Sequence, residues 1–303
     1  MSTRMSSHTI KLSLFLCLSM CLGIGILRFS YTALLAGTRE AFGWSTDFAG
    51  LLGSANLLGY LIGAYTAMRL PQDRSMSRYI QISAFAGMFS LMCCAFSGFS
   101  EVWYIVWRVI SGISGGLMMI LSPSVVAQCC ELQDRLKINF IGFSGIGLGV
   151  LIATLFLPYL DQISIQTAWL ILCGFALLIC LCLSGLIQKF KPYLSVQAPS
   201  TTSKISLNSV FYSLLAVYAC SAFAYIPHSL FWIDYLSQQL ELSLFWINFN
   251  WILYGFGSAL GAFSAYALAR KFGNFAALKI LYSLYIVAIF IATLEGQALL
   301  TLS

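Results

Sequence analysis

A single arginine lies in the middle of a long apolar stretch of this sequence. Residues 12–36 contain only one charged side chain, that of Arg28. An arginine at the centre of a membrane helix costs about 3 kcal/mol on insertion scales, so its side chain must face protein, water or a ligand. A guanidinium is a planar fork of hydrogen-bond donors that fits a carboxylate, a sulfonate or a phosphate. The sequence therefore predicts that Arg28 either binds an anion or bonds helix carbonyls or Asn56 and so joins two helices.

Four further polar residues lie in apolar stretches. Arg108 presents the same alternatives as Arg28, and Tyr31 lies near Arg28 at helical spacing, where it offers a polar contact. Asn56 either contacts a ligand or holds two helices together. His228 follows a proline and either transfers protons or packs as a polar residue. At about 1.5 Å of rise per residue, Arg28, Arg108 and His228 all fall in the outer half of a membrane.

The elements that must position these residues are membrane-spanning helices. Hydrophobic residues make up 60% of the 303 residues, charged residues 9%, and the mean hydropathy is +0.88. A soluble domain has about 25% charged residues. The net charge of +6 is spread between apolar segments, so no nucleic-acid partner is expected. Nine segments are long enough to cross a bilayer, at residues 12–36, 46–68, 79–98, 102–128, 136–158, 167–188, 210–233, 245–268 and 275–294.

The distribution of basic residues predicts the orientation of these segments. If the nine segments alternate, 16 Lys and Arg residues divide very unequally between the two sides. Arg39 lies on the far side, Arg28 and Arg108 lie within segments, and all others lie on the side of the N-terminus. Because cytoplasmic loops carry an excess of Lys and Arg, we expect a cytoplasmic N-terminus in a bacterial inner membrane.

A polar stretch divides the predicted helices into two groups. Residues 189–208 are rich in Ser, Thr, Pro and Lys. We therefore expect a six-helix N-terminal half at 1–188, a cytoplasmic linker at 189–208, and a partial C-terminal half of about three helices at 209–303. An alignment of the two halves that matches Gly59 with Gly257 also matches Gly63 with Gly261, which indicates parallel repeats.

Glycines and cysteines have structural interpretations. Gly59 and Gly63, like Gly257 and Gly261, are one helical turn apart and should allow close helix packing. The glycine-rich segment at 142–149 follows no strand, so it is not a phosphate loop. Nearly all 10 cysteines lie in apolar segments without a ligand set for a metal, so neither a metal site nor a disulfide framework is expected.

Short motifs in the first half carry a resemblance to a known family. They are GILRFSYTALL at 25–35, GWS at 43–45, AG at 49–50, SANLLGYLIGA at 54–64, WRVISG at 107–112 and GFSGIGLG at 142–149. Together they resemble the major facilitator superfamily, and more closely its YbfB/YjiJ-type branch. The resemblance implies an all-α membrane protein, a helical bundle in which helices 1, 4, 7 and 10 line a central cavity. It places Arg28, Arg108, Tyr225 and His228 on those helices.

The sequence also departs from the family pattern. Loop 69–78 retains little of the usual glycine and acidic–basic motif, and helix 5 lacks the Gly-Pro pair of many proton-coupled antiporters. Members have six helices in each half, so we expect the 303-residue chain to stop after the third helix of its second half.

Two functions remain open at this stage. The first is a secondary transporter that moves a small, anionic solute by alternating access. The alternative is a truncated remnant that does not transport, or a membrane scaffold or sensor. No enzyme and no cofactor are expected, and the predicted partners are a small-molecule solute and the lipid bilayer. The residues expected to bind the solute are Arg28, Tyr31, Asn56, Arg108, Tyr225 and His228.

Overall fold

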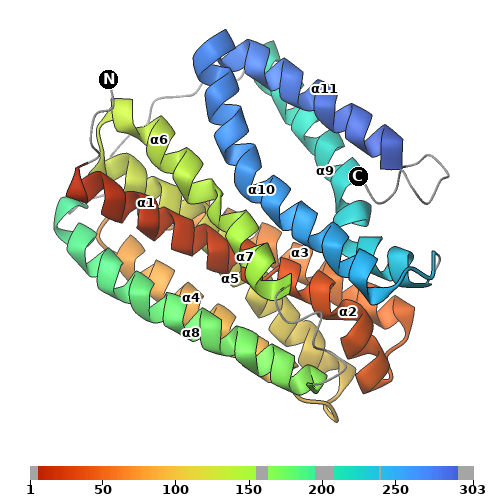
Figure 1. Cartoon of the computed structure of the whole chain (residues 1–303). Coiled ribbons are helices and arrows are strands. Elements are labelled where there is room, and N and C mark those ends of the chain that lie inside the picture. Colours follow the sequence, from red (N-terminus) through yellow and green to blue (C-terminus); the bar gives the residue numbers. More distant parts are fainter. Residues whose placement is uncertain (1–5, 155–162, 195–207, 239, 293–303) are drawn as a thin grey trace.

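The protein is a bundle of long helices. A computed structural model describes residues 6–154, 163–194, 208–238 and 240–292 (Figure 1). These residues form helices joined by short turns, and no strand occurs among them. The predicted all-α fold class is confirmed.

Eleven α-helices and two short irregular helices follow one another along the described chain. They are α1 (Ser7–Met20), the π-helical η1 (Cys21–Ile26), α2 (Phe29–Phe42), α3 (Thr46–Arg69), α4 (Met76–Cys94), α5 (Glu101–Cys129), α6 (Leu132–Phe143), α7 (Gly145–Thr154), α8 (Ile165–Phe190), the 3-10 helix η3 (Lys191–Tyr193), α9 (Ser209–Gln238), α10 (Leu244–Phe272) and α11 (Asn274–Ala292).

Local sequence explains where several of these helices begin and end. The side chains of Ser45 and Ser164 each accept a hydrogen bond from a backbone N–H in the first turn of α3 and α8. This capping satisfies a donor that the helix itself cannot pair. Gly43 ends α2 with a φ of 67°, a left-handed conformation that glycine adopts without strain.

Eight helical stretches in the described residues are long and apolar enough to cross a membrane, one fewer than the sequence predicted. The difference lies at predicted segment 79–98, which forms α4 and packs along α5 and α8. Arg78 and Gln81 lie in its first two turns and lower the hydropathy of α4. The ends of predicted segments 136–158 and 275–294, and most of the linker, lie outside the described residues.

The first predicted segment is not one regular helix. Between α1 and α2 the backbone winds as a π-helix, in which the N–H of Leu27 donates to the carbonyl oxygen of Leu22 at 3.0 Å. Arg28 follows at the turn before α2, with a φ of −103°. The segment at 136–158 is likewise divided, at Ser144, into α6 and α7.

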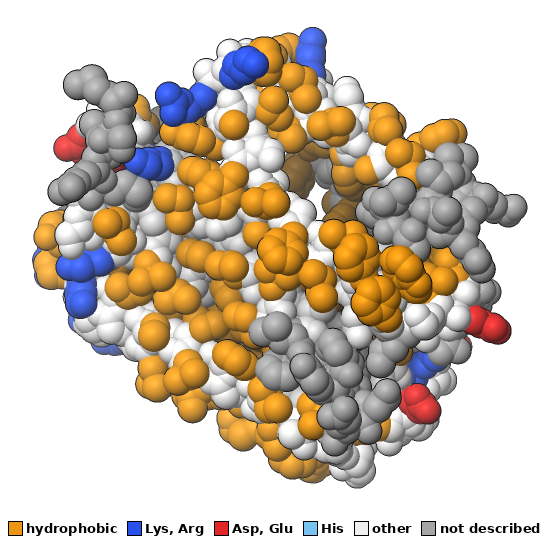
Figure 2. Space-filling model, viewed as in Figure 1, with side chains coloured by type: hydrophobic (Ala, Val, Ile, Leu, Met, Phe, Trp, Pro, Cys, Tyr) orange, Lys and Arg blue, Asp and Glu red, His pale blue; other side chains and the backbone are white. Residues whose placement is uncertain are grey.

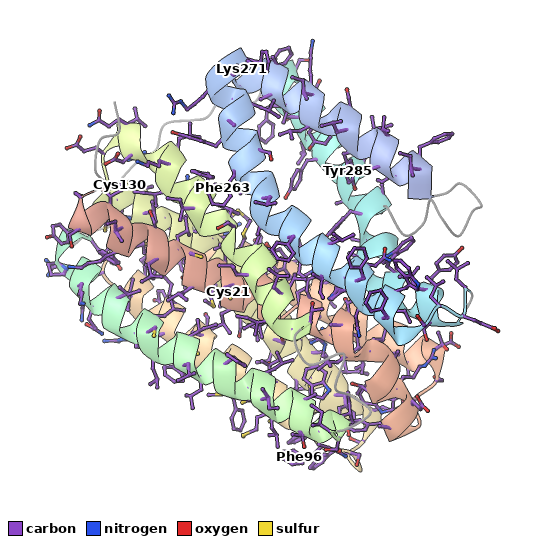
Figure 3. All side chains as sticks on the ribbon, in the orientation of Figure 1. Cys21, Phe96, Cys130, Phe263, Lys271 and Tyr285 are labelled. Atoms are coloured by element: carbon purple, nitrogen blue, oxygen red, sulfur yellow. The ribbon has the colours of Figure 1, made fainter. Side chains whose placement is uncertain are left out.

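Side-chain contacts show that the helix ends of the N-terminal half gather at two opposite ends of the bundle. At one end, His8 of α1 bonds the carbonyl oxygen of Cys129 at 2.8 Å and contacts the ring of Phe190. At the other end, Trp169 donates to Thr38 at 3.0 Å. Figure 3 labels Cys130 near the first end and Phe96 at the second. In Figure 2, Lys and Arg gather mainly toward the first end and the turn between α10 and α11.

Close packing in the N-terminal half depends on glycine. A Cβ added to Gly59 of α3 would meet the carbonyl group of Val109, and one added to Gly112 of α5 would meet that of Asn56. The close approach predicted for Gly59 and its neighbour one turn on is therefore confirmed. At Gly257 a Cβ would meet no described atom within 4 Å, and the same holds at the next glycine of that motif, so close approach is not found there.

Most of the hydrophobic core lies among α1–α8, and α9, α10 and α11 pack beside these helices (Figure 1). The core extends to the second group through side chains of α9 and α10, namely Trp232, Leu236, Ile247 and Trp251. The contact between the two groups includes α7 and α10, where Gly147 faces Gly255 and Ala259. Helices α2 and α9 also touch, and this contact brings α9 next to Arg28.

Candidate functional site

The break between η1 and α2 exposes a backbone carbonyl to a neighbouring helix. The carbonyl oxygen of Leu27 accepts a hydrogen bond from the hydroxyl of Ser111 at 3.0 Å and a longer one from Nη1 of Arg108 at 3.4 Å. Both donors belong to α5. The irregular backbone before Arg28 is thus held by polar side chains from across the bundle, which is how membrane proteins satisfy freed backbone groups.

Arg108 is buried among protein groups. Its side chain is 2% exposed, and its guanidinium carbon lies 4.2 Å from the centre of the Tyr31 ring. The Tyr31 hydroxyl in turn donates to the carbonyl oxygen of Ala49 at 2.7 Å. These contacts join α2, α3 and α5, and they support the interpretation that Arg108 holds helices together.

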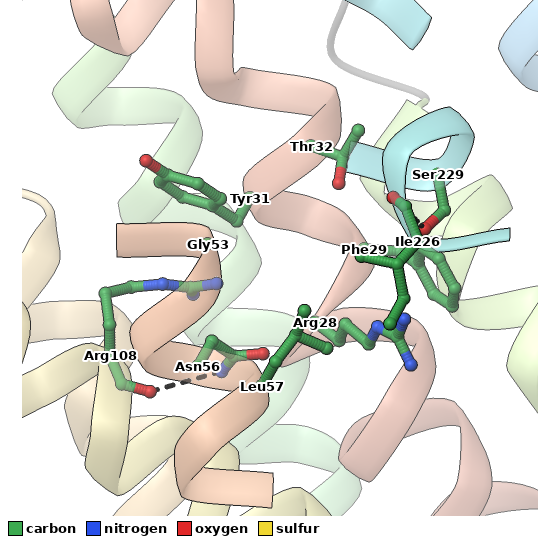
Figure 4. A pocket seen from close by; sticks show the side chains of 10 residues that line it. All are labelled: Arg28, Phe29, Tyr31, Thr32, Gly53, Asn56, Leu57, Arg108, Ile226 and Ser229. Carbon is green, nitrogen blue, oxygen red and sulfur yellow. Dashed lines mark hydrogen bonds between the residues drawn. The ribbon is translucent and has the colours of Figure 1, made fainter. Parts of the chain in front are cut away.

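The side chain of Asn56 joins α3 to α5. Its Nδ2 donates to the carbonyl oxygen of Arg108 at 3.2 Å, as the dashed line in Figure 4 shows. The side chain is 3% exposed. This bond favours the interhelical role of the two that the sequence left open.

Arg28 has a different environment from Arg108. It is half-buried, and its guanidinium carbon lies 5.2 Å from the ring centre of Phe29 and 5.9 Å from that of Tyr225. Figure 4 shows its side chain extending toward Ile226 of α9, whereas Arg108 lies beside Tyr31. Arg28 therefore reaches from the N-terminal group of helices to the C-terminal group.

An aromatic network holds Tyr225 next to Arg28. The hydroxyls of Tyr225 and Tyr254 are hydrogen-bonded, which joins α9 to α10. The Tyr254 ring stacks on Trp251 at 4.8 Å and meets Phe29 edge to face at 5.6 Å. Residues from both groups of helices thus surround the Arg28 head group.

Two cavities meet at Arg28. The smaller has a volume of about 20 Å³, and the larger has a volume of about 720 Å³. The small one is lined by Arg28, Phe29, Tyr31, Thr32, Gly53, Asn56, Leu57, Arg108, Ile226 and Ser229 (Figure 4). The large one is lined by Arg28, Leu57, Tyr60, Leu61, Tyr218, Ser221, Ala222, Tyr225, Ile226, Leu278, Leu281, Tyr282 and Tyr285.

The charges on these walls have one sign. Among the described residues that line the cavities, Arg28 and Arg108 are the charged ones, and only Arg28 lines the large cavity. In the same described residues, no group of three or more His, Cys, Asp and Glu side chains could hold a metal ion. These walls can attract an anion, because they carry two arginines and, among the described lining residues, no acidic side chain that would neutralise them.

The structure brings most of the expected site residues together. Arg28, Tyr31, Asn56 and Arg108 line the small cavity, and Tyr225 joins Arg28 on the wall of the large one. The backbone of residue 228 belongs to α9, but the side chain of His228 lies outside the described part of the chain.

Two tyrosines outside the set expected to bind the solute also take part in this site. Tyr60 lines the large cavity one helical turn after Asn56, so helical spacing on α3 could have indicated it. Tyr254 bonds Tyr225 from another helix, and nothing in the spacing of the sequence marks that pairing.

Comparison with known proteins identifies the family. A family described as "Uncharacterised MFS-type transporter YbfB" matches residues 20–303. The chain belongs to this family. It is therefore a multi-pass membrane transporter of the major facilitator superfamily (MFS), and its family and fold indicate a transporter rather than an enzyme.

Solved structures show that the chain has the MFS fold. The human organic anion transporter MFSD10 (TETRAN) is 18% identical, with a TM-score of 0.67 over 97% of this chain and 81% of that one. An inward-open structure of the xylose transporter XylE from E. coli is 15% identical, with a TM-score of 0.63 over 97% of this chain and 78% of that one. A bacterial homologue of the human lysosomal transporter Spinster is 17% identical, with a TM-score of 0.59 over 89% and 64%. The predicted MFS-like bundle is confirmed.

Proposed function

We propose that this YbfB-type protein transports a small anionic solute by alternating access, and that Arg28 binds the anion. The observation that carries the proposal is the position of Arg28 on the wall of a cavity of about 720 Å³, where it is the charged residue among the described lining. Further support comes from the structural neighbour MFSD10, which is an organic anion transporter.

The energetics of Arg28 favour this role. A guanidinium at membrane depth lacks the hydration it would have in water, and an anion placed beside it restores part of that stabilisation. Its contact with Tyr225 means that a bound anion would touch both groups of helices. A site shared by two groups of helices is the arrangement that alternating access requires.

We further propose the orientation and organisation predicted from the sequence. The N-terminus lies in the cytoplasm, the membrane is a bacterial inner membrane, and a linker at 189–208 joins a six-helix half to the helices that follow. The gathering of basic side chains toward one end of the molecule supports this orientation. Tyr31, Asn56, Arg108 and His228 remain proposed site residues beside Arg28 and Tyr225. The non-transporting alternative gains no support from these observations.

Transport measurements with arginine variants test the proposed function. In proteoliposomes, Arg28→Ala should lower uptake of radiolabelled organic anions by about tenfold or more, because a charge-assisted hydrogen bond is worth about 1.5–3 kcal/mol. Arg28→Lys should also be impaired, since an ammonium cannot form the bidentate contact. Arg39→Ala, which removes an arginine at the end of α2, serves as the matched control and should transport normally.

The result could go against the proposal in two ways. Normal anion uptake by Arg28→Ala would exclude the binding role, and uptake of neutral solutes in preference to anions would exclude the anionic substrate. If Arg28→Ala instead loses its monodisperse peak on size-exclusion chromatography, Arg28 has a structural role.

A further inference from the structure

We infer that the solute is an amphipathic organic monoanion, with its charged group at Arg28 and an apolar, ring-containing body in the large cavity. This inference rests on the proposed function and specifies its substrate class. It follows from the unequal size of the two cavities, from the side chains that line each, and from the place of Arg28 between them.

The sizes of the cavities decide where the body of the solute lies. A cavity needs about 10–15 Å³ to hold one water molecule, so the small cavity of about 20 Å³ has room for little more than one water or one oxygen of an anionic group. Ligand pockets are about 300–1,000 Å³, a range that includes the large cavity of about 720 Å³. The body of a solute must therefore lie on the large-cavity side of Arg28.

The lining of the large cavity selects an apolar body with rings. Apart from Arg28 and Ser221, its described wall consists of aliphatic side chains and five tyrosines. The carbonyl of Ser221 already accepts a hydrogen bond from the hydroxyl of Tyr285 at 2.9 Å. A compact polar solute such as a dicarboxylate would leave most of this wall without a matching surface. Aromatic rings pack favourably against other rings and apolar groups, and their hydroxyls can orient a solute.

The charges indicate a single negative charge on the solute. Arg28 is the cation on the large-cavity wall, while Arg108 is buried between the Tyr31 ring and the Leu27 carbonyl. A second carboxylate in the large cavity would face only neutral side chains of the described lining, and burial of an unpaired charge is unfavourable.

The small cavity gives the anionic group polar surroundings. The hydroxyl residues Thr32 and Ser229 line it, together with both arginines. Within the described residues, the buried Nε of Arg108 has no hydrogen-bond partner. An oxygen of the anionic group, or a water that bridges to it, would supply an acceptor there. The site therefore has a polar end and an apolar end that meet at Arg28.

A matched ligand series on the unmodified full chain in nanodiscs tests this inference. The probes are naphthalene-2-carboxylate, its uncharged carboxamide, and acetate. Naphthalene-2-carboxylate should raise the melting temperature with increasing concentration, as expected for a ligand of the folded state. It should bind at least about tenfold more tightly than acetate or the carboxamide, a difference that corresponds to loss of one good contact.

Two variants that replace an alanine of α9 by tryptophan locate the body of the ligand. Ala222→Trp places a large ring in the cavity and should weaken binding of naphthalene-2-carboxylate by about tenfold or more, since overpacking displaces the ligand. Ala224→Trp, on the exposed side of the same helix, should leave binding unchanged. Equal weakening by both variants would place the ligand elsewhere and overturn the inference.

The ligand series separates failure of the inference from failure of the proposed function. Acetate that binds as tightly as naphthalene-2-carboxylate would overturn the apolar body while anion recognition stands. A carboxamide that binds as tightly as the carboxylate would overturn both, because the charge would then contribute nothing.

Discussion

The guanidinium carbon of Arg108 lies 4.2 Å above the ring of Tyr31, and both side chains are almost completely buried. This contact fixes α5 against α2 directly beside the irregular backbone that precedes Arg28. The position of the proposed anion-binding arginine therefore depends on a second arginine that the membrane bundle encloses.

Replacement of Tyr31 separates the ring contact from the hydroxyl bond. Tyr31→Leu removes the ring and should lower the free energy of unfolding by about 2 kcal/mol or more, the magnitude of a desolvated cation–π interaction. Tyr31→Phe keeps the ring and loses only the hydrogen bond to Ala49, which costs about 1 kcal/mol. Unfolding of the detergent-solubilised protein by heat or denaturant measures both changes. Equal effects of the two variants would show that the ring contact with Arg108 contributes nothing.

Glycines at equivalent positions of the two halves should respond in opposite directions to alanine. In Gly59→Ala the new Cβ would lie 2.9 Å from the carbonyl carbon of Val109, and overpacking should destabilise the protein by about 1–3 kcal/mol. In Gly257→Ala the Cβ meets no described atom within 4 Å, and the gain in helix propensity should stabilise the protein by about 0.5–1 kcal/mol. Thermal unfolding of the two variants side by side checks the signs. A destabilised Gly257→Ala variant would indicate close packing at that glycine.

The contact between α7 and α10 should be sensitive to the addition of one methyl group. A Cβ on Gly147 would lie 2.5 Å from the carbonyl oxygen of Gly255. Overpacking costs about 1–3 kcal/mol, and here it would destabilise the one conformation of the transport cycle in which α7 and α10 are in contact. The population of that conformation would change by about tenfold, so Gly147→Ala should slow uptake by about tenfold. Gly174→Ala on α8, where a Cβ meets no described atom within 4 Å, is the control in the same proteoliposome assay. Equal uptake by the two variants would show that α7 and α10 separate without cost.

The loop between α3 and α4 should contribute a small, pH-dependent term to stability. The hydroxyl and backbone N–H of Ser75 donate to Oδ1 of Asp73 at 2.6 and 2.7 Å, and these bonds lower the pKa of Asp73 below its ordinary 3.8. Because the folded-state pKa is depressed, the stabilisation is present above pH 3.8 and is lost as the pH falls through the folded value.

The variant Ser75→Ala measures this term. It should be less stable than the parent protein at neutral pH, and the difference should disappear at strongly acidic pH, where Asp73 is protonated in both states. Unfolding across about pH 2–6 records the trend. Ser54→Ala, which removes an exposed hydroxyl from α3, should show a difference that does not vary with pH.

Hydropathy was sufficient to predict most of the fold. The apolar segments and the all-α class follow from the cost of burying polar backbone in lipid, which leaves helices as the solution. Gly59 was interpreted correctly because small residues one turn apart permit close packing wherever another helix is available. Gly257 has the same spacing and no close neighbour in the described structure, since spacing does not reveal which helix face has a partner.

The candidate site was predicted less completely. Arg28 and Arg108 stood out because an ionisable residue in an apolar helix is costly. The sequence did not reveal that the two arginines have different environments, because the burial of Arg108 depends on contacts with Tyr31 and Leu27, which are distant in sequence. The pairing of Tyr225 with Tyr254 depends on how α9 meets α10, and a regular α-helix through residues 12–36 was expected where the structure has a π-helical turn.

The direction of Arg28 depends on the winding of that π-helical turn. A π-helix accommodates an extra residue in its turn, and Cys21–Ile26 forms such a turn directly before Arg28. If the same residues wound as a regular α-helix instead, every residue after the turn would be displaced by about one position, and α2 would rotate relative to α1 by about 100°. The guanidinium would then point away from the cavity although the residue itself was unchanged. The direction of the proposed anion-binding arginine therefore depends on how one turn of the first membrane helix winds as much as on the identity of its one charge.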